Sequence, residues 1–225
     1  MVKKKLFVKV LLVPILTAFL CLYVYSYIDN NGAGGGYGGG SGESSGGSVI
    51  CSLDNDIEYF IMLGAGHFLE AKSRVQRLLK AVEWKDIQWA NYFEMTRLVE
   101  NALYHMNNAK YIYRILIHTA EITPYNESVQ SLLKGFDYDA FMLEKGLNKG
   151  MFDIVRQHLQ AGDITGIFRQ THTNYITIIH LLEAVKQDVH NNKMPGMTVF
   201  WRLNEAVDNN SIMGSYVARV FAEIL

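Results

Sequence analysis

Apolar side chains recur at alternating steps of three and four residues from Leu53 to the end of the chain. This spacing follows one face of an α-helix, whereas a half-buried strand would place an apolar residue at every second position. Short segments rich in polar residues, glycine or proline separate the stripes. The pattern predicts an all-α domain, an antiparallel up-down helical bundle of four long helices plus a short or broken helix.

The segments between the stripes set the expected limits of the helices. Gly162 followed by Asp163 is typical of a helix stop and a new N-cap, and Thr198 is expected to cap the last helix. Gly135, Gly146 and Gly150 interrupt the middle of the chain, which is expected to be broken into a short piece and a longer one. The predicted helices cover residues 54–82, 86–121, a short piece ending at 134, 137–160, 164–192, and 198 onward.

Two stripes carry small or polar residues where bulky ones are expected. They are Gly64, Ala65 and Gly66 in the first long helix, and Asn210, Ser211 and Gly214 in the last. Either neighbouring helices approach each other closely at these places or a small pocket opens between them. Close packing is the preferred interpretation.

An uncharged run of 19 residues, from Val10 to Ile28, lies ahead of the helical part. It approaches the ~20 residues that a helix needs to cross a bilayer, and the lysines on its amino side predict a cytoplasmic N-terminus. A cleaved signal peptide is the alternative, while a lipoprotein signal at Cys21 is disfavoured because the bulky Leu20 precedes it. Each alternative exports the same domain, but a retained anchor is predicted.

The chain therefore divides into four regions. Residues 1–9 form a basic cytoplasmic N-terminus, 10–28 the single transmembrane helix, 29–50 a Gly/Ser-rich tether, and 51–225 the helical-bundle domain. A tether of this composition behaves as flexible coil with a root-mean-square span of roughly 25 Å. The expected location is a single-pass protein of the cytoplasmic (inner) membrane, whose C-terminal domain lies outside the cytoplasm.

Charge and cysteine content narrow the classes of partner. The chain has 21 basic and 22 acidic residues, and the Lys and Arg beyond the leader are scattered singly. Nucleic acid is therefore excluded as a partner, because a phosphate-binding surface needs a clustered basic face. Cys51 is the only cysteine outside the apolar run, so it either links two chains or remains a free thiol.

Histidines provide the only pattern with possible metal chemistry. His-x-x-Glu occurs at His67, His118 and His180, but the last two point away from their stripes, so the repeat is interpreted as surface ion-pair spacing. His67, His105 and His172 are better placed as ligands, each on the flank of a stripe where haem or copper could bind. Flanking histidines are commonly half-exposed without a ligand, so no metal and no cofactor is predicted.

No catalytic constellation occurs in the sequence, and no catalytic residue is predicted. The expected function is a non-catalytic, membrane-tethered module for protein interaction or ligand binding outside the cytoplasm. Its partner is expected to be another protein or a second copy of the chain, and exposed aromatics are candidates for the contact surface. These aromatics are Trp84, Trp89, Tyr111 and Trp201. The alternative function is a metal- or haem-binding bundle for electron transfer or metal handling.

Overall fold

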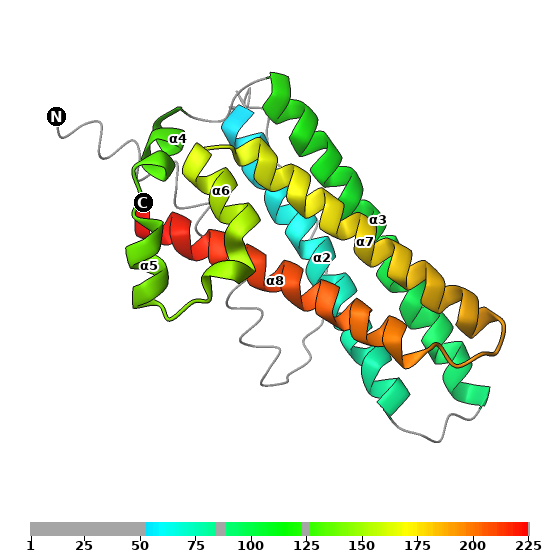
Figure 1. Ribbon diagram of the computed structural model, residues 1–225. Coiled ribbons are helices and arrows are strands. Elements are labelled where there is room, and N and C mark those ends of the chain that lie inside the picture. The colour runs from blue at the N-terminus through cyan, green and yellow to red at the C-terminus, as the bar shows by residue number, and fades with distance from the viewer. Residues whose placement is uncertain (1–52, 84–88, 123–126, 225) are drawn as a thin grey trace, which may run out of the picture.

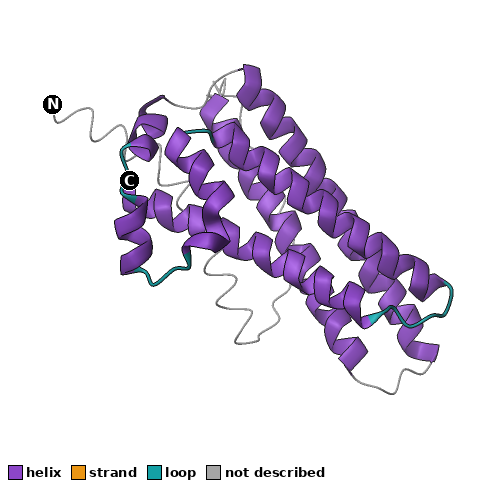
Figure 2. Ribbon diagram, in the orientation of Figure 1, coloured by secondary structure: helices purple, strands orange, loops and turns teal. Residues whose placement is uncertain are grey.

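Helices account for all the regular structure in the computed structural model, which describes residues 53–83, 89–122 and 127–224. No strand occurs within these ranges (Figure 2), so the predicted all-α class is confirmed. The elements are α2 (Leu53–Glu83), α3 (Trp89–Ile122), α4 (Glu127–Lys134), α5 (Tyr138–Glu144), the 3-10 helix η2 (Lys149–Phe152), α6 (Asp153–Ala161), α7 (Ile164–His190) and α8 (Met197–Ile224).

The four long helices α2, α3, α7 and α8 run in alternating directions along the chain. Figure 1 shows α3 packed along α2 and α7, and α8 inclined across the bundle. The N-terminal part of α8 lies beside the end of α7, and the two helices then diverge. Helices α4, α5 and α6 gather near the C-terminal part of α8. The predicted antiparallel arrangement of the long helices is thus confirmed.

The predicted stripes form the core. On α3 the side chains of Met95, Val99, Met106 and Leu116 are fully buried, and Leu182 of α7 is buried as completely. Burying such side chains stabilises the fold by roughly 1.5–3 kcal/mol each relative to leaving them in water. Because the stripes are long and nearly continuous, the helices are held along most of their length.

The predicted single helix over residues 137–160 is wrong. Gly146 adopts φ +63, a left-handed conformation that ends α5, and the side chain of Asn148 then accepts a hydrogen bond from the Gly150 N–H to start η2. A second helix, α6, begins only at Asp153. Two short helices therefore replace one long one, because a glycine at positive φ cannot continue a right-handed helix.

The predictions for the helix caps are confirmed in part. Gly162 ends α6 at φ +66, and the Asp163 carboxylate accepts from the Gly166 N–H at 2.8 Å to open α7. The prediction for Thr198 is wrong, because α8 already begins at Met197. Its first turn closes onto the Gly196 carbonyl, which accepts from the Val199 N–H at 2.9 Å.

Several expectations fall outside the described residues. They concern the anchor over 10–28 with its signal-peptide alternative, the tether over 29–50, and Cys51. Among the helices that the structure does describe, none has the length and apolar character needed to cross a membrane.

Candidate functional site

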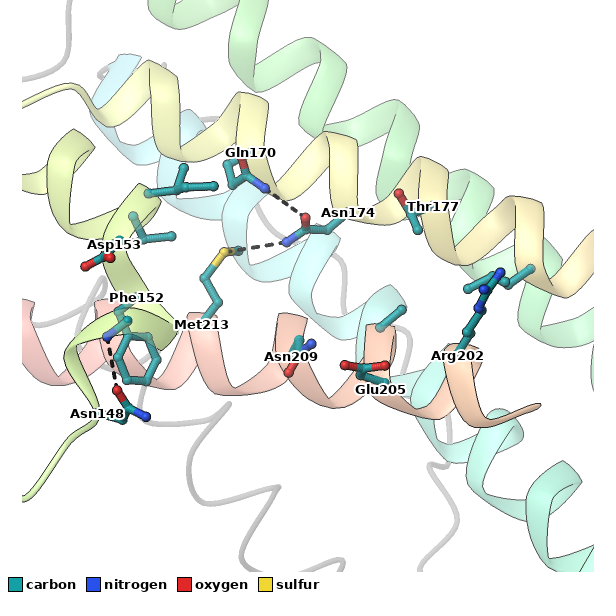
Figure 3. Close-up of a pocket in the computed structure, with 15 residues that line it drawn as sticks. Asn148, Phe152, Asp153, Gln170, Asn174, Thr177, Arg202, Glu205, Asn209 and Met213 are labelled. Atoms are coloured by element: carbon teal, nitrogen blue, oxygen red, sulfur yellow. Dashed lines mark hydrogen bonds between the residues drawn. The ribbon is translucent and has the colours of Figure 1, made fainter. Parts of the chain in front are cut away.

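A cleft of about 890 Å³ opens where α7 and α8 diverge. The segment formed by η2 and the start of α6 lines one end of it, as Figure 3 shows. Its size lies within the range of small-molecule binding sites, roughly 300–1,000 Å³. The polar lining comprises Gln170, Asn174 and Thr177 from α7, Arg202, Glu205 and Asn209 from α8, and Asn148 and Asp153 from the end segment.

Helical spacing places these polar side chains on the cleft. Gln170, Asn174 and Thr177 follow one another at steps of four and three, immediately beside the buried stripe of α7. On α8 the cleft is lined by Arg202, Glu205 and Asn209, at steps of three and four. Each helix therefore presents an apolar face to the core and a polar flank to the cleft.

A chain of side-chain amides leads from the cleft into the core. The Gln170 amide donates to Asn174 Oδ1 at 3.0 Å, and the Asn174 amide donates to Asn210 Oδ1 at 3.1 Å. Asn174 also lies 3.6 Å from the Met213 sulfur. Asn210 is only 5% exposed, so this hydrogen bond satisfies a buried polar group that would otherwise be costly.

Two buried tyrosines continue the polar chain. Tyr175 is hydrogen-bonded to both Asn210 and Tyr113, and the rings of the two tyrosines meet edge to face at 5.1 Å. Burial raises the pKa of Tyr113 to about 12, and burial raises the pKa of Tyr175 well above its ordinary value. Both phenols therefore stay protonated near neutral pH and act as neutral hydrogen-bonding groups.

A second, smaller chamber of about 50 Å³ lies behind the cleft. Asn210, Ser211 and Gly214 of α8 line it, and Met213 lines both the chamber and the cleft. At Gly64, by contrast, an added Cβ would lie 2.8 Å from the Tyr113 ring, so α2 and α3 do approach closely there. The predicted close packing is thus found at Gly64, whereas the alternative, a small pocket, is found along α8.

The three histidines proposed as metal ligands do not converge. His67 and His105 come together across α2 and α3, with their Nδ1 atoms 3.0 Å apart. His172 lies near Lys110 and Arg114 instead, and its pKa is lowered by burial and then by these two cations. Within the described ranges, no group of three or more His, Cys, Asp or Glu side chains is arranged to hold a metal ion.

The repeated His-x-x-Glu pattern does not form histidine-glutamate pairs. His118 and His180 are exposed, as their angular positions predicted. Glu70 pairs with Arg74, and Glu121 pairs with Arg169 at 2.6 Å. Two of the three glutamates, Glu70 and Glu121, therefore take arginine partners, one on its own helix and one on α7.

The predicted aromatic surface is only partly described. Tyr111 and Trp201 are 63% and 68% exposed, but they belong to different helices, α3 and α8. The side chain of Trp89, like the whole of Trp84, lies outside the described residues. Tyr111 has other exposed apolar neighbours along α3, a row that sequence reasoning missed although its helical spacing could have indicated it.

Sequence reasoning also missed the cleft, because polar residues on the flank of a helix have the same spacing whether the flank faces a cleft or bulk water. No His, Cys or Ser occurs among the described residues that line the cleft. The arrangement supplies hydrogen-bond donors, acceptors and single charges of both signs, which suits recognition of a polar molecule.

No protein-family model matches the sequence, and no curated protein or solved structure is significantly similar to it.

Proposed function

We propose that the protein is a non-catalytic binding module, tethered to the cytoplasmic membrane through residues 10–28, that takes a polar ligand in the cleft between α7 and α8. The observation that carries the proposal is the amide chain from Gln170 through Asn174 to Asn210, which holds polar groups in fixed positions along the cleft. Preorganised polar groups on rigid helices favour specific binding, because little ordering is needed when the ligand arrives.

The unpaired polar groups of α8 indicate the chemistry of the ligand. The side chains of Arg202, Glu205 and Asn209 make no hydrogen bond or ion pair with other described residues. They are free to meet a ligand, and together with Gln170 they present donors and acceptors in close succession. A molecule with amide or hydroxyl groups is therefore the expected occupant.

The binding proposal can be tested by thermal unfolding of the full chain in detergent. The probes are N-acetylated dipeptide amides and monosaccharides, which represent amide and hydroxyl ligands. A ligand that binds the folded state raises the melting temperature in a concentration-dependent way. We expect Arg202→Ala combined with Asn209→Ala to abolish this shift, whereas Glu183→Ala, an exposed change on α7, should preserve it. Equal shifts in both variants would place binding elsewhere.

A metal- or haem-binding bundle is the second candidate function. It is favoured only by the pair His67 and His105, whose facing Nδ1 atoms could supply two nitrogen ligands. The visible spectrum and metal content of the purified protein separate the two functions. A stoichiometric metal or a haem band that disappears in His67→Gln would favour the second, and colourless, metal-free protein would eliminate it.

A further inference from the structure

A row of large apolar side chains lies exposed along α3. Phe93, Tyr104, Tyr111 and Ile122 are 77%, 63%, 63% and 68% exposed. They are separated by steps of 11, 7 and 11 residues, so at about 100° per residue all four fall within roughly 20° of one line along the helix. Helix α3 packs against α2 and α7 (Figure 1), and among the described helices none covers the side of α3 on which the row lies.

The spacing of the four residues is the same from either end of the row. The midpoint between Phe93 and Ile122 and the midpoint between Tyr104 and Tyr111 both fall between residues 107 and 108. A two-fold axis through this point would lay α3 antiparallel on the α3 of a second copy. The inner tyrosines would then meet each other, and each Phe93 would meet an Ile122, as an isologous interface requires.

We propose that this row, Phe93, Tyr104, Tyr111 and Ile122, is a homodimer interface occupied by a second copy of the chain. The proposal is independent of ligand binding, because the row lies on α3 and the cleft lies between α7 and α8.

The charges beside the row agree with this pairing. The same axis brings Glu100 of each copy next to Arg114 of the other. Glu100 already pairs loosely with Lys186 of α7, at 3.7 Å, whereas the Arg114 side chain has no ion-pair partner among the described residues and would gain one. Glu94 and Glu121 lie on opposite flanks of the row, because Glu94 pairs with Arg77 of α2 and Glu121 pairs with Arg169 of α7, so they do not meet across the axis. Their charges are already balanced, because Glu94 binds Arg97 at 2.8 Å and Glu121 binds Arg169 at 2.6 Å. The interface therefore gains attraction without adding an uncompensated repulsion.

The surface area that the row could bury is sufficient for a specific but small interface. Large side chains of this kind bury on the order of 150–250 Å² each. Covering the exposed part of all four in both copies would remove roughly 1,100 Å² from water, at the lower end of specific protein interfaces. Aromatic side chains contribute most at such contacts, and three of the four are aromatic.

Site-directed cross-linking tests the axis directly, in membranes that contain the full chain with Cys21→Ser and Cys51→Ser. Asn107→Cys places a thiol next to the proposed axis, where the two copies can form a disulfide. Asn101→Cys, also exposed on α3, lies about six residues from the axis, and its two thiols would then be too far apart to bond. We expect mild oxidation to dimerise the first variant and leave the second monomeric; the reverse result, or no cross-link in either, would overturn the proposal.

A second measurement uses the mass of the detergent-solubilised full chain by light scattering. Tyr104→Glu combined with Tyr111→Glu places four like charges at the axis of the dimer, so at least a tenfold weakening of dimerisation is expected. Tyr59→Glu changes a similarly exposed aromatic on α2, at 60% exposure, and should leave the dimer intact. Circular dichroism checks that both variants keep their helices. A dimer that survives the double change, or a wild-type chain that is monomeric, contradicts the interface.

Discussion

At the level of single residues, a contact between two histidines helps to join the two longest helices, α2 and α3. His67 of α2 and His105 of α3 face each other through their Nδ1 atoms at 3.0 Å, so one neutral ring donates and the other accepts. The pKa of His105 is lowered by burial first, and then by the nearby charges of Arg74 and His67, while Glu70 opposes the shift. Protonation of His105 therefore adds a positive charge at a partly buried site that lies near the Arg74 cation.

The lowered pKa of His105 predicts a loss of stability in acid. Because the folded protein binds this proton less readily than the unfolded chain, protonation favours unfolding. The contribution of His105 is fully present above the ordinary histidine pKa of about 6.5 and is lost as the pH falls through the lower folded value. We expect the free energy of unfolding, measured by urea titration at several pH values between 7 and 5, to fall less steeply in His105→Gln than in the wild type.

The matched control for this titration is His118→Gln, which changes an exposed histidine of the same helix. It should follow the wild-type pH dependence. The pKa of His172 is also lowered, so His172 should still contribute part of the pH dependence of the free energy of unfolding in both variants. An identical slope in His105→Gln and the wild type would show that the pair does not contribute to acid sensitivity.

At the scale of elements, glycines mark where helices break and where they touch. Gly146 and Gly162 adopt positive φ and end α5 and α6, whereas Gly64 lies inside α2 and allows the Tyr113 ring of α3 to pack against its backbone. Tyr113 is itself held by edge-to-face contacts with Phe168 and Tyr175. The ring therefore has little freedom to move away from α2.

Two glycines in the same helix should respond in opposite ways to alanine. Gly64→Ala places a Cβ 2.8 Å from the Tyr113 ring, so α2 and α3 must separate and the protein should lose about 1–3 kcal/mol of stability. Gly66→Ala meets no atom within 4 Å, and it should add roughly 0.5–1 kcal/mol because alanine favours the helix. Chemical denaturation measures both changes. The same sign for both variants would mean that the approach of the helices does not constrain Gly64.

At the scale of the whole molecule, α8 gives the bundle its asymmetry. It lies beside the end of α7 and then leaves it, and the short helices α4, α5 and α6 gather around its C-terminal part (Figure 1). The divergence opens the polar cleft, while the apolar row on α3 lies on another helix of the bundle. The proposed ligand cleft and the proposed dimer interface therefore lie on different helices, so the two proposals do not compete for one surface.

Attachment to the membrane is the prediction at this scale. The run over 10–28 is uncharged and long enough to span, its lysine flank is on the amino side, and three tyrosines mark its other end. We expect the protein to remain in the membrane fraction after an alkaline carbonate wash, with the intact mass of the full chain. Recovery in the soluble fraction, with an N-terminus near Tyr27, would show instead that the run is a cleaved signal peptide.

The pattern of apolar residues is enough to predict the helices and most of their ends. A stripe such as Val99, Met106 and Tyr113 has the helical period whatever surrounds it, and the same stripe is buried in the fold. The helix stop at Gly162 and the N-cap at Asp163 could be predicted from the sequence, because a left-handed stop and an Asp cap act through local backbone geometry. Gly146 was recognised as an interruption, but it could have adopted either sign of φ, so the sequence did not show that it ends α5 and divides the predicted piece over 137–160.

Which polar residues form a site depends on how the helices pack, and the sequence pattern does not show it. Gln170 and Asn174 lie on a helix flank that would look the same if it faced water, and the divergence of α8 from α7 turns that flank into a cleft. The tertiary structure likewise brought His67 to His105 and left His172 elsewhere, because helix periodicity sets the direction of a side chain but not the neighbour that it meets. Local sequence controls the backbone within a few residues, whereas a site depends on how distant helices pack.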